Sequence, residues 1–121
     1  MNKDSVLLTI PKKPDYISVV RLTSSSISYK CGLNIDEIED IKVAIGEACV
    51  NSFSLCANET ISIKFELEEE KLVIKVSDAR EDIPEDLDNA RDRELGILII
   101  KSLMDEVNFD DNGIEMTKYI V

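Results

Sequence analysis

The sequence predicts an α+β fold, a two-layer α/β sandwich in which three helices cover one face of a mostly antiparallel five-stranded sheet. Apolar residues alternate with polar ones in five short segments, and they recur at helical spacing in three longer ones. The segments follow one another in the order β-α-α-β-β-loop-α-β-β. Each has only one apolar face or stripe, and two packed layers bury all of these faces together.

The first half of the chain contains one expected strand and two expected helices. Residues 6–10 alternate and are followed by Pro11, which predicts a strand that ends at the proline. Pro14-Asp15 opens a helix, and Gly32 stands where a helix C-terminus favours a left-handed residue. Asn34 is a good N-cap for the second helix. The expected buried stripe of that helix consists of Ile38, Ile41, Ile45, Ala48, Cys49 and Phe53.

The second half returns to strands. Residues 61–67 and 72–76 alternate on either side of an acidic turn, which predicts a pair of antiparallel strands. Residues 78–93 are dominated by charge and predict a loop, followed by a strongly apolar helix over 94–104. The last two strands form an expected hairpin closed by Asn112-Gly113, a strong turn signal.

Composition and charge limit the function. With 14 basic and 25 acidic residues the net charge is −11, which makes nucleic acids and anionic membranes poor partners. The absence of histidine excludes Ser-His-Asp catalysis and His-ligated zinc. Length predicts a single domain over residues 1–121. An odd number of cysteines, together with no long apolar run, favours a reduced protein of the cytoplasm.

Glu47 and Asn51 carry the clearest sign of chemistry. They are four residues apart in the second helix, so their side chains project from one face. A carboxylate beside an amide oxygen could provide a general base and a metal ligand. Spacing alone fits a surface pair on an amphipathic helix equally well, and that alternative stays open.

The segment Glu47-Ala-Cys-Val-Asn51 resembles the N box, E-A-x-x-N, of the GHKL (Bergerat-fold) ATPases. Residues 17–23, 36–42, 102–107 and 116–119 are similar, in the same order, to the anti-sigma factor serine-protein kinases of Gram-positive bacteria. These kinases are partner-switching regulators of stress response and sporulation. The resemblance covers nearly the whole chain and implies a Bergerat-type fold.

This resemblance implies roles for five residues. Glu47 corresponds to the catalytic base, and Asn51 to a nucleotide-binding residue that is also the Mg²⁺ ligand. Asp78 corresponds to the aspartate that accepts a hydrogen bond from the adenine amino group, and Gly96 to a glycine at a helix start that approaches phosphate. Arg21 corresponds to a first-helix arginine that contacts partners.

The resemblance also implies ATP and Mg²⁺ as cofactors. The implied partners are a sigma factor, an anti-anti-sigma (STAS-type) protein and a second copy of the chain in a homodimer. In the family, the first glycine box reads D-x-G-x-G, whereas Asp78 is followed here by Ala79-Arg80-Glu81-Asp82. The ATP lid between the glycine boxes is also short.

Two interpretations follow. In one, the chain is a compact anti-sigma factor that phosphorylates a serine of an anti-anti-sigma protein with ATP-Mg²⁺. In the other, it is a degenerate, non-catalytic binding module (a pseudokinase) that acts by occupancy only.

Overall fold

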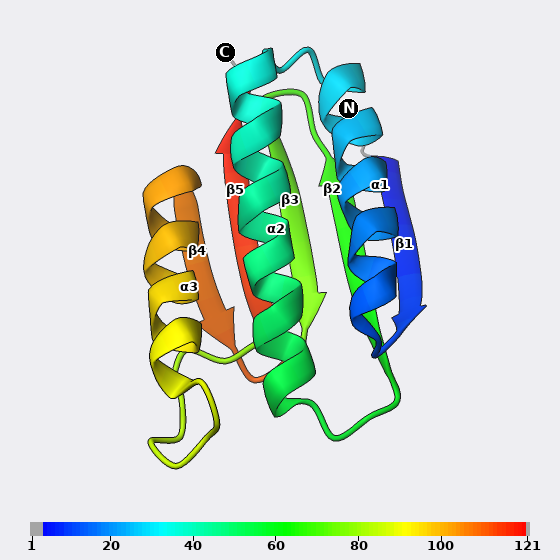
Figure 1. Ribbon diagram of the computed structural model, residues 1–121. Coiled ribbons are helices and arrows are strands. Elements are labelled where there is room, and N and C mark those ends of the chain that lie inside the picture. Colours follow the sequence, from blue (N-terminus) through cyan, green and yellow to red (C-terminus); the bar gives the residue numbers. More distant parts are fainter. Residues whose placement is uncertain (1–3, 121) are drawn as a thin grey trace.

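Three α-helices cover one face of a five-stranded sheet, as the sequence predicts (Figure 1). The computed structural model describes residues 4–120, so residues 1–3 and 121 of the expected domain lie outside the described part. The elements, in the predicted order, are β1 (Asp4–Pro11), a 3₁₀ turn η1 (Pro14–Tyr16), α1 (Ile17–Lys30), α2 (Ile35–Leu55), β2 (Thr60–Leu67), β3 (Lys71–Ser77), α3 (Ala90–Leu103), β4 (Glu106–Asp110) and β5 (Gly113–Tyr119).

All neighbouring strands of the sheet are antiparallel. The spatial order is β1-β2-β3-β5-β4, so the connection that contains α3 leaves the central strand β3 and returns at the edge strand β4. Helix α2 lies across the middle of the sheet between α1 and α3 (Figure 1). The C-terminal half of α2 therefore lies next to both the end of β3 and the start of α3.

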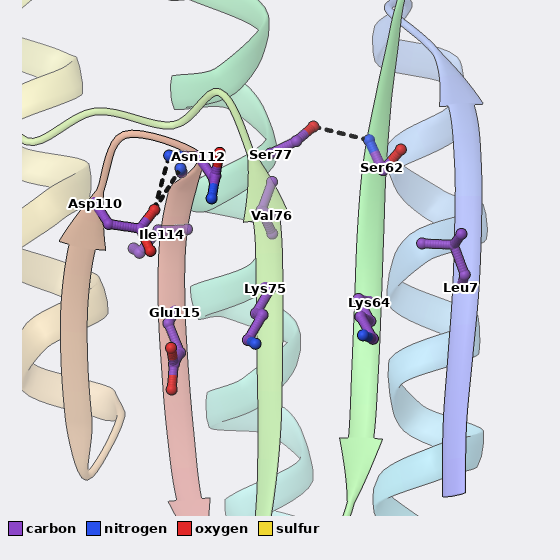
Figure 2. Close-up of a pocket in the computed structure, with 11 residues that line it drawn as sticks. Leu7, Ser62, Lys64, Lys75, Val76, Ser77, Asp110, Asn112, Ile114 and Glu115 are labelled. Atoms are coloured by element: carbon purple, nitrogen blue, oxygen red, sulfur yellow. Dashed lines mark hydrogen bonds between the residues drawn. The ribbon is translucent and has the colours of Figure 1, made fainter.

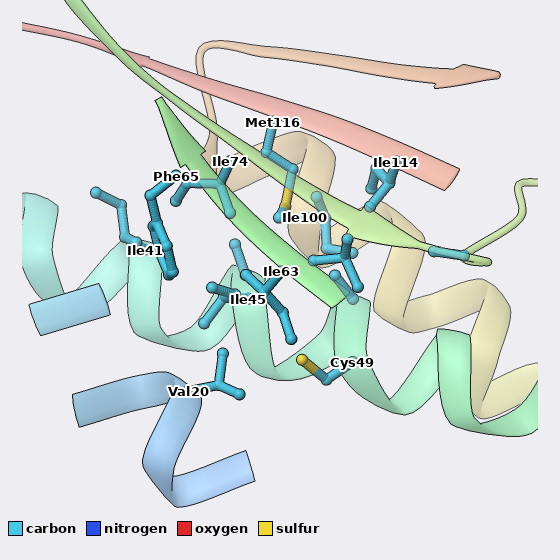
Figure 3. Close-up of a cluster of buried hydrophobic side chains, with 14 of the residues drawn as sticks. Val20, Ile41, Ile45, Cys49, Ile63, Phe65, Ile74, Ile100, Ile114 and Met116 are labelled. Carbon is cyan, nitrogen blue, oxygen red and sulfur yellow. The ribbon is translucent and has the colours of Figure 1, made fainter. Parts of the chain in front are cut away.

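The core lies between α2 and the three inner strands (Figure 3). Ile63, Phe65 and Ile74 alternate along β2 and β3 and are completely buried against Ile41 and Ile45 of α2. Within the predicted α2 stripe, Ala48 and Cys49 are also completely buried, whereas Ile38 and Phe53 are partly buried. The helical and strand periodicities therefore identified the inward faces correctly.

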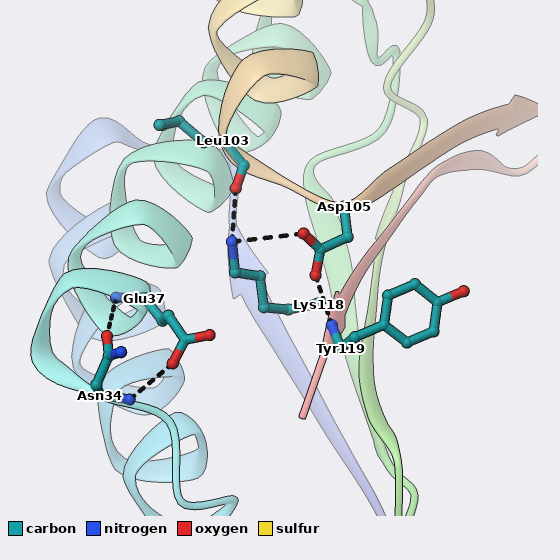
Figure 4. A network of polar contacts seen from close by, with 6 residues as sticks. All are labelled: Asn34, Glu37, Leu103, Asp105, Lys118 and Tyr119. Carbon is teal, nitrogen blue, oxygen red and sulfur yellow. Dashed lines mark hydrogen bonds and ion pairs between the residues drawn. The ribbon is translucent and has the colours of Figure 1, made fainter. Parts of the chain in front are cut away.

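The predicted N-cap of α2 is confirmed. The Asn34 side chain accepts a hydrogen bond from the Glu37 amide at 2.8 Å, and the Glu37 carboxylate accepts one from the Asn34 amide at 3.0 Å (Figure 4). This capping box satisfies two amide groups that the first turn of a helix leaves without partners. It defines where the long helix that carries Glu47 and Asn51 begins.

A buried lysine ties the end of α3 to the sheet. The Lys118 ammonium donates to the Leu103 carbonyl at 2.9 Å and lies 3.9 Å from Asp105, whose carboxylate accepts from the Tyr119 amide (Figure 4). Lys118 is 8% exposed, so the carbonyl and the carboxylate replace most of its hydration. The end of α3 is thereby positioned against β5.

The start of two helices differs from the prediction. The helix expected over 94–104 begins at Ala90. The sequence pattern does not reveal this first turn, because its charged residues show no apolar period. The first helix begins at Ile17, after the Pro14–Tyr16 3₁₀ turn. These differences move Gly96 from an expected helix start into the interior of α3.

Candidate functional site

The structure brings four of the five predicted site residues to one junction between α2, the end of β3 and α3. Glu47 and Asn51 lie on one face of α2, Asp78 follows the last residue of β3, and Gly96 lies in α3. A Cβ added at Gly96 would lie 2.6 Å from the Glu47 Oε1 atom, so the carboxylate rests directly on the α3 backbone. Gly96 thus permits the close approach of Glu47. It lies in the interior of α3 and not at the helix start that the resemblance implies.

The Asn51 side chain forms a pair of hydrogen bonds with the backbone of Arg80. Its amide nitrogen donates to the Arg80 carbonyl at 3.0 Å, and its oxygen accepts from the Arg80 N–H at 2.9 Å. Asn51 is only 2% exposed. The amide therefore joins α2 to the segment that follows β3.

Further hydrogen bonds hold the turn at Asp78. The buried Ser52 hydroxyl donates to the Ser77 carbonyl at 2.6 Å, and the Asp78 N–H donates to the Asn112 carbonyl at 2.9 Å. Asp78 has a φ of 65°, a left-handed conformation that non-glycine residues seldom adopt. These bonds compensate for the backbone cost of that conformation and hold the main chain from which the Asp78 side chain projects.

Cys56 contacts the Asp78 carboxylate. Its thiol donates to Asp78 Oδ2 at 3.2 Å, and the Asn58 amide donates to the Cys56 sulfur at 3.2 Å. Burial and the bond to Asp78 both raise the pKa of the Cys56 thiol, so it remains a neutral donor at neutral pH. Among the described residues, no hydrogen bond to Asp78 Oδ1 is found, and that oxygen can accept a bond from a ligand.

Arg21 lies apart from this cluster. It is an exposed residue of α1, and a Cβ added at Gly46 would lie 2.5 Å from its Nη2 atom, so its guanidinium covers Gly46 of α2. Burial raises the pKa of the Cys49 thiol to about 12, and the nearby Arg21 charge opposes this shift. Arg21 can therefore contribute to a protein surface. It contacts α2 at Gly46, on a different face of that helix from the Glu47 side chain.

The segment after Asp78 is acidic and tied to α3. The carboxylate of Glu81 forms an exposed ion pair with Lys101 at 2.6 Å. A cavity of about 380 Å³ lies beside this segment, between residues 80–82 and residues 109–111. Its lining includes Glu81, Asp82, Asp110 and Asp111, against the single cation Arg80. Such a lining disfavours a polyanionic ligand.

A second cavity lies on the helix-free face of the sheet. It has a volume of about 260 Å³ and is bordered by Leu7, Lys64, Lys75 and Glu115, with the turn at Asp110 above it (Figure 2). Both lysines are within 3.5 Å of the Glu66 carboxylate. None of the five predicted site residues lines this cavity.

The residues present fit an adenine base better than they fit Mg²⁺. Asp78 offers a carboxylate oxygen that suits the adenine amino group. A divalent cation needs several accessible oxygen ligands, but the Asn51 oxygen is buried and accepts the Arg80 N–H. Across residues 4–120 no cluster of three His, Cys, Asp or Glu side chains could hold a metal ion.

Sequence reasoning missed Ser52, Cys56 and the backbone of Arg80 as parts of this junction. The two side chains were visible as a polar residue and a thiol near the end of α2, but neither residue type indicates its partner. The Arg80 contact involves only its main chain, and any residue except proline offers the same groups.

The fold and this junction define the class of protein, and comparisons with known proteins agree. Residues 10–118 match the family described as "Histidine kinase-like ATPase domain". The chain is 30% identical to the "Serine-protein kinase RsbW" of Bacillus subtilis (strain 168), over 98% of this chain and 88% of that protein. It is 34% identical to the protein of the same name from Staphylococcus aureus (strain JH9), with the same coverage.

One solved structure has a similar fold. It is "The crystal structure of the RsbU and RsbW domains of Rv1364c from Mycobacterium tuberculosis", with a TM-score of 0.67 and 16% sequence identity. The likeness covers 96% of this chain and 32% of that chain. The chain belongs to the histidine kinase-like ATPase family and, within it, to the anti-sigma factor serine-protein kinases of the RsbW type.

No helix within residues 4–120 combines the length and the apolar character that crossing a membrane requires.

Proposed function

We propose that this chain is an anti-sigma factor that sequesters an alternative sigma factor by direct contact and releases it when an anti-anti-sigma protein binds. The observation that carries this proposal is the match to RsbW serine-protein kinases over 98% of the chain. The net charge of −11 supports it, because it complements the basic surfaces with which sigma factors bind DNA and accelerates association with them.

Arg21 is the proposed partner-contact residue. Its guanidinium is exposed on α1 and its position over Gly46 limits the directions in which it can point. An arginine held in this way forms bidentate bonds to a carboxylate with little loss of side-chain entropy. We expect the chain to act as a homodimer in the cytoplasm.

Asp78 is the proposed adenine-binding residue. Its φ of 65°, the bonds that Ser52 and Cys56 donate to this turn and the bond that the Asp78 N–H donates to Asn112 give the carboxylate a defined position, with Oδ1 free of bonds from the described residues. ATP, when bound, supplies the phosphoryl group for modification of a partner serine. Glu47 is the proposed base for that serine, and its contact with the Gly96 backbone gives its carboxylate a defined position.

Binding without catalysis is the second candidate function. Two observations favour it: Asn51 is bonded to the Arg80 backbone, and the segment that replaces the first glycine box is acidic. Phosphoryl transfer depends on positioning and on neutralising the phosphate charges, and both features oppose that. The two candidates share sigma-factor sequestration and differ in whether a partner serine becomes phosphorylated.

Transcription in vitro tests sequestration. Each alternative sigma factor of the host, with core RNA polymerase, is titrated with the purified chain, and one of them should be inhibited at near-equal molar ratio. Arg21→Ala should weaken that inhibition by about tenfold, a loss typical of one interface arginine. Lys30→Ala, which removes another exposed cation of α1, is the matched control and should behave as the wild type. Failure to inhibit any of the alternative sigma factors would reject the proposal.

Adding the anti-anti-sigma protein and radiolabelled ATP to the same mixture separates the two candidates. Phosphate on the partner that is lost in Glu47→Ala supports the kinase, whereas release of the sigma factor without phosphate supports the non-catalytic module.

A further inference from the structure

The strongest unexplained feature of the site is the pairing of Asn51 with the Arg80 backbone. The two hydrogen bonds, at 3.0 and 2.9 Å, engage both polar atoms of the side chain and both polar groups of one residue. A pair of this kind is far more specific than one bond, because the planar amide must be correctly oriented for both. Since Asn51 is 2% exposed, water does not compete effectively for these bonds.

We propose that Asn51 is a clamp that holds the segment after β3 on α2, and that this chain binds an adenine nucleoside or nucleotide through Asp78 without a divalent cation on Asn51. The ligand half of this inference rests on the adenine-binding role proposed for Asp78. The clamp half rests only on the described hydrogen bonds. The ligand is an adenine compound whose binding does not depend on metal.

The clamp acts on the segment that would otherwise cradle phosphate. Backbone N–H groups bind phosphate when they point into an open loop, but the Arg80 N–H points at Asn51. The neighbouring bond from Ser52 to Ser77 and the bond from Cys56 to Asp78 hold the same segment on α2. Detaching Arg80 to expose its N–H would therefore leave a buried amide side chain without partners.

The charges of the segment agree with this ligand class. Glu81 and Asp82 follow Arg80 directly, and Asp110 and Asp111 lie across the adjacent cavity. Lys101, the nearby cation of α3, is already paired with Glu81 at 2.6 Å. Asp78 thus offers a hydrogen-bond acceptor to the base, whereas Glu81 and Asp82, three and four residues further along the chain, repel a triphosphate. Affinity should therefore fall as phosphates are added.

Amide exchange measured by NMR tests the clamp directly. In the wild type, the Arg80 amide proton and the Asn51 side-chain NH₂ protons should exchange slowly, and Mg²⁺ with ATP should leave both rates unchanged. Asn51→Ala should accelerate Arg80 exchange by about tenfold or more, as expected when a buried local bond is lost. Ser54→Ala, which removes an exposed hydroxyl bonded to Val50 on the same helix, is the control and should have no effect on Arg80.

Asn51→Asp distinguishes a clamp from a metal ligand. A carboxylate binds Mg²⁺ better than an amide, so a metal-ligand role predicts that this variant binds metal at least as well as the wild type. A clamp role predicts faster Arg80 exchange, because the bond to the Arg80 carbonyl is lost and two acceptors then face each other. If Asn51→Ala does not fold, this variant and the wild-type exchange data still decide the question.

Calorimetric titration tests the ligand class. The dissociation constants of adenosine, ADP and ATP should rise in that order and should differ by less than about threefold between Mg²⁺ and EDTA, a difference too small for a coordinated metal. Two results would overturn the inference. One is that Mg²⁺-ATP accelerates exchange of the Arg80 amide proton, and the other is that Mg²⁺ tightens ATP binding tenfold and Asn51→Ala abolishes it. If no adenine compound binds, the ligand half fails together with the role of Asp78, while the exchange rates decide the clamp separately.

Discussion

Gly113→Ala should be one of the most damaging single-methyl changes in this protein. Gly113 is the first residue of β5 and pairs with Ser77, directly beside the Asp78 turn. Its φ of 145° is a conformation that L-residues rarely adopt. A Cβ added there would lie 2.1 Å from the Val76 carbonyl oxygen and 3.0 Å from the Asp78 nitrogen, both of them backbone atoms.

The expected cost follows from these two effects. The backbone conformation alone costs about 1–3 kcal/mol for a non-glycine residue. Relief of the contact with the Val76 oxygen requires β3 and β5 to separate, and this adds about 1–3 kcal/mol, as for other overpacked sites. Together these give an expected loss of about 2–6 kcal/mol in the free energy of unfolding, a large part of the total stability of a small domain.

Gly32→Ala is the matched control. Gly32 also has a positive φ, 83°, but a Cβ added there meets no atom within 4 Å. Its substitution should cost about 1–2 kcal/mol, the conformational term alone. Urea denaturation followed by circular dichroism should give a midpoint for Gly113→Ala that is lower by about 1 M or more than that of Gly32→Ala. Equal midpoints would refute the steric argument.

Three further predictions concern buried groups of the site and the core. Ser52→Ala should lower the free energy of unfolding by about 1–3 kcal/mol, because it leaves the Ser77 carbonyl without its 2.6 Å hydrogen bond; denaturant titration measures this, and a neutral effect would contradict it. Raising the pH from 9 towards 12 should destabilise the fold, because the Cys49 thiol loses its proton near 9.0 when unfolded and near 12 when folded, so the unfolded state binds fewer protons. The loss due to Cys49 is about 1.4 kcal/mol at about pH 10 and should be absent from Cys49→Ala. Stability of this variant that falls in parallel with that of the wild type between pH 8 and 10 would contradict the prediction. Gly96→Ala should gain about 1 kcal/mol of helix propensity but displace the Glu47 carboxylate, so a double-mutant cycle with Glu47→Ala should show a coupling of about 0.5–1 kcal/mol, and additive effects would contradict the contact.

The element order could be predicted because burial imposes a period on the sequence. Alternation in β2 and β3 and the helical stripe of α2 identify inward faces that the structure confirms. The start of α3 could not be predicted in the same way, since the three residues that follow Ala90 in its first turn are all charged and leave no repeated apolar position that would mark a helical period.

The site was predictable where it depends on side-chain spacing within one element. Glu47 and Asn51 are placed on one face by the helix itself, and the structure brings them to the junction with Asp78 and Gly96. The Arg80 contact was not predictable, because it is made by main-chain groups that every non-proline residue has. The loss of the glycines after Asp78 indicated an altered phosphate loop but not what the segment does instead.

Base selectivity tests the role of this junction most directly. Adenine presents an amino group to the Asp78 carboxylate, whereas guanine presents a carbonyl oxygen at the corresponding position, which the carboxylate repels. Competitive titration should show adenine nucleotides bound at least tenfold more tightly than guanine nucleotides, a preference of about 1.4 kcal/mol. Asp78→Asn, whose amide can donate to guanine, should remove most of this preference. Equal affinity of the wild type for the two bases, or a preference that survives in Asp78→Asn, would contradict the assignment of Asp78 as the adenine-binding residue.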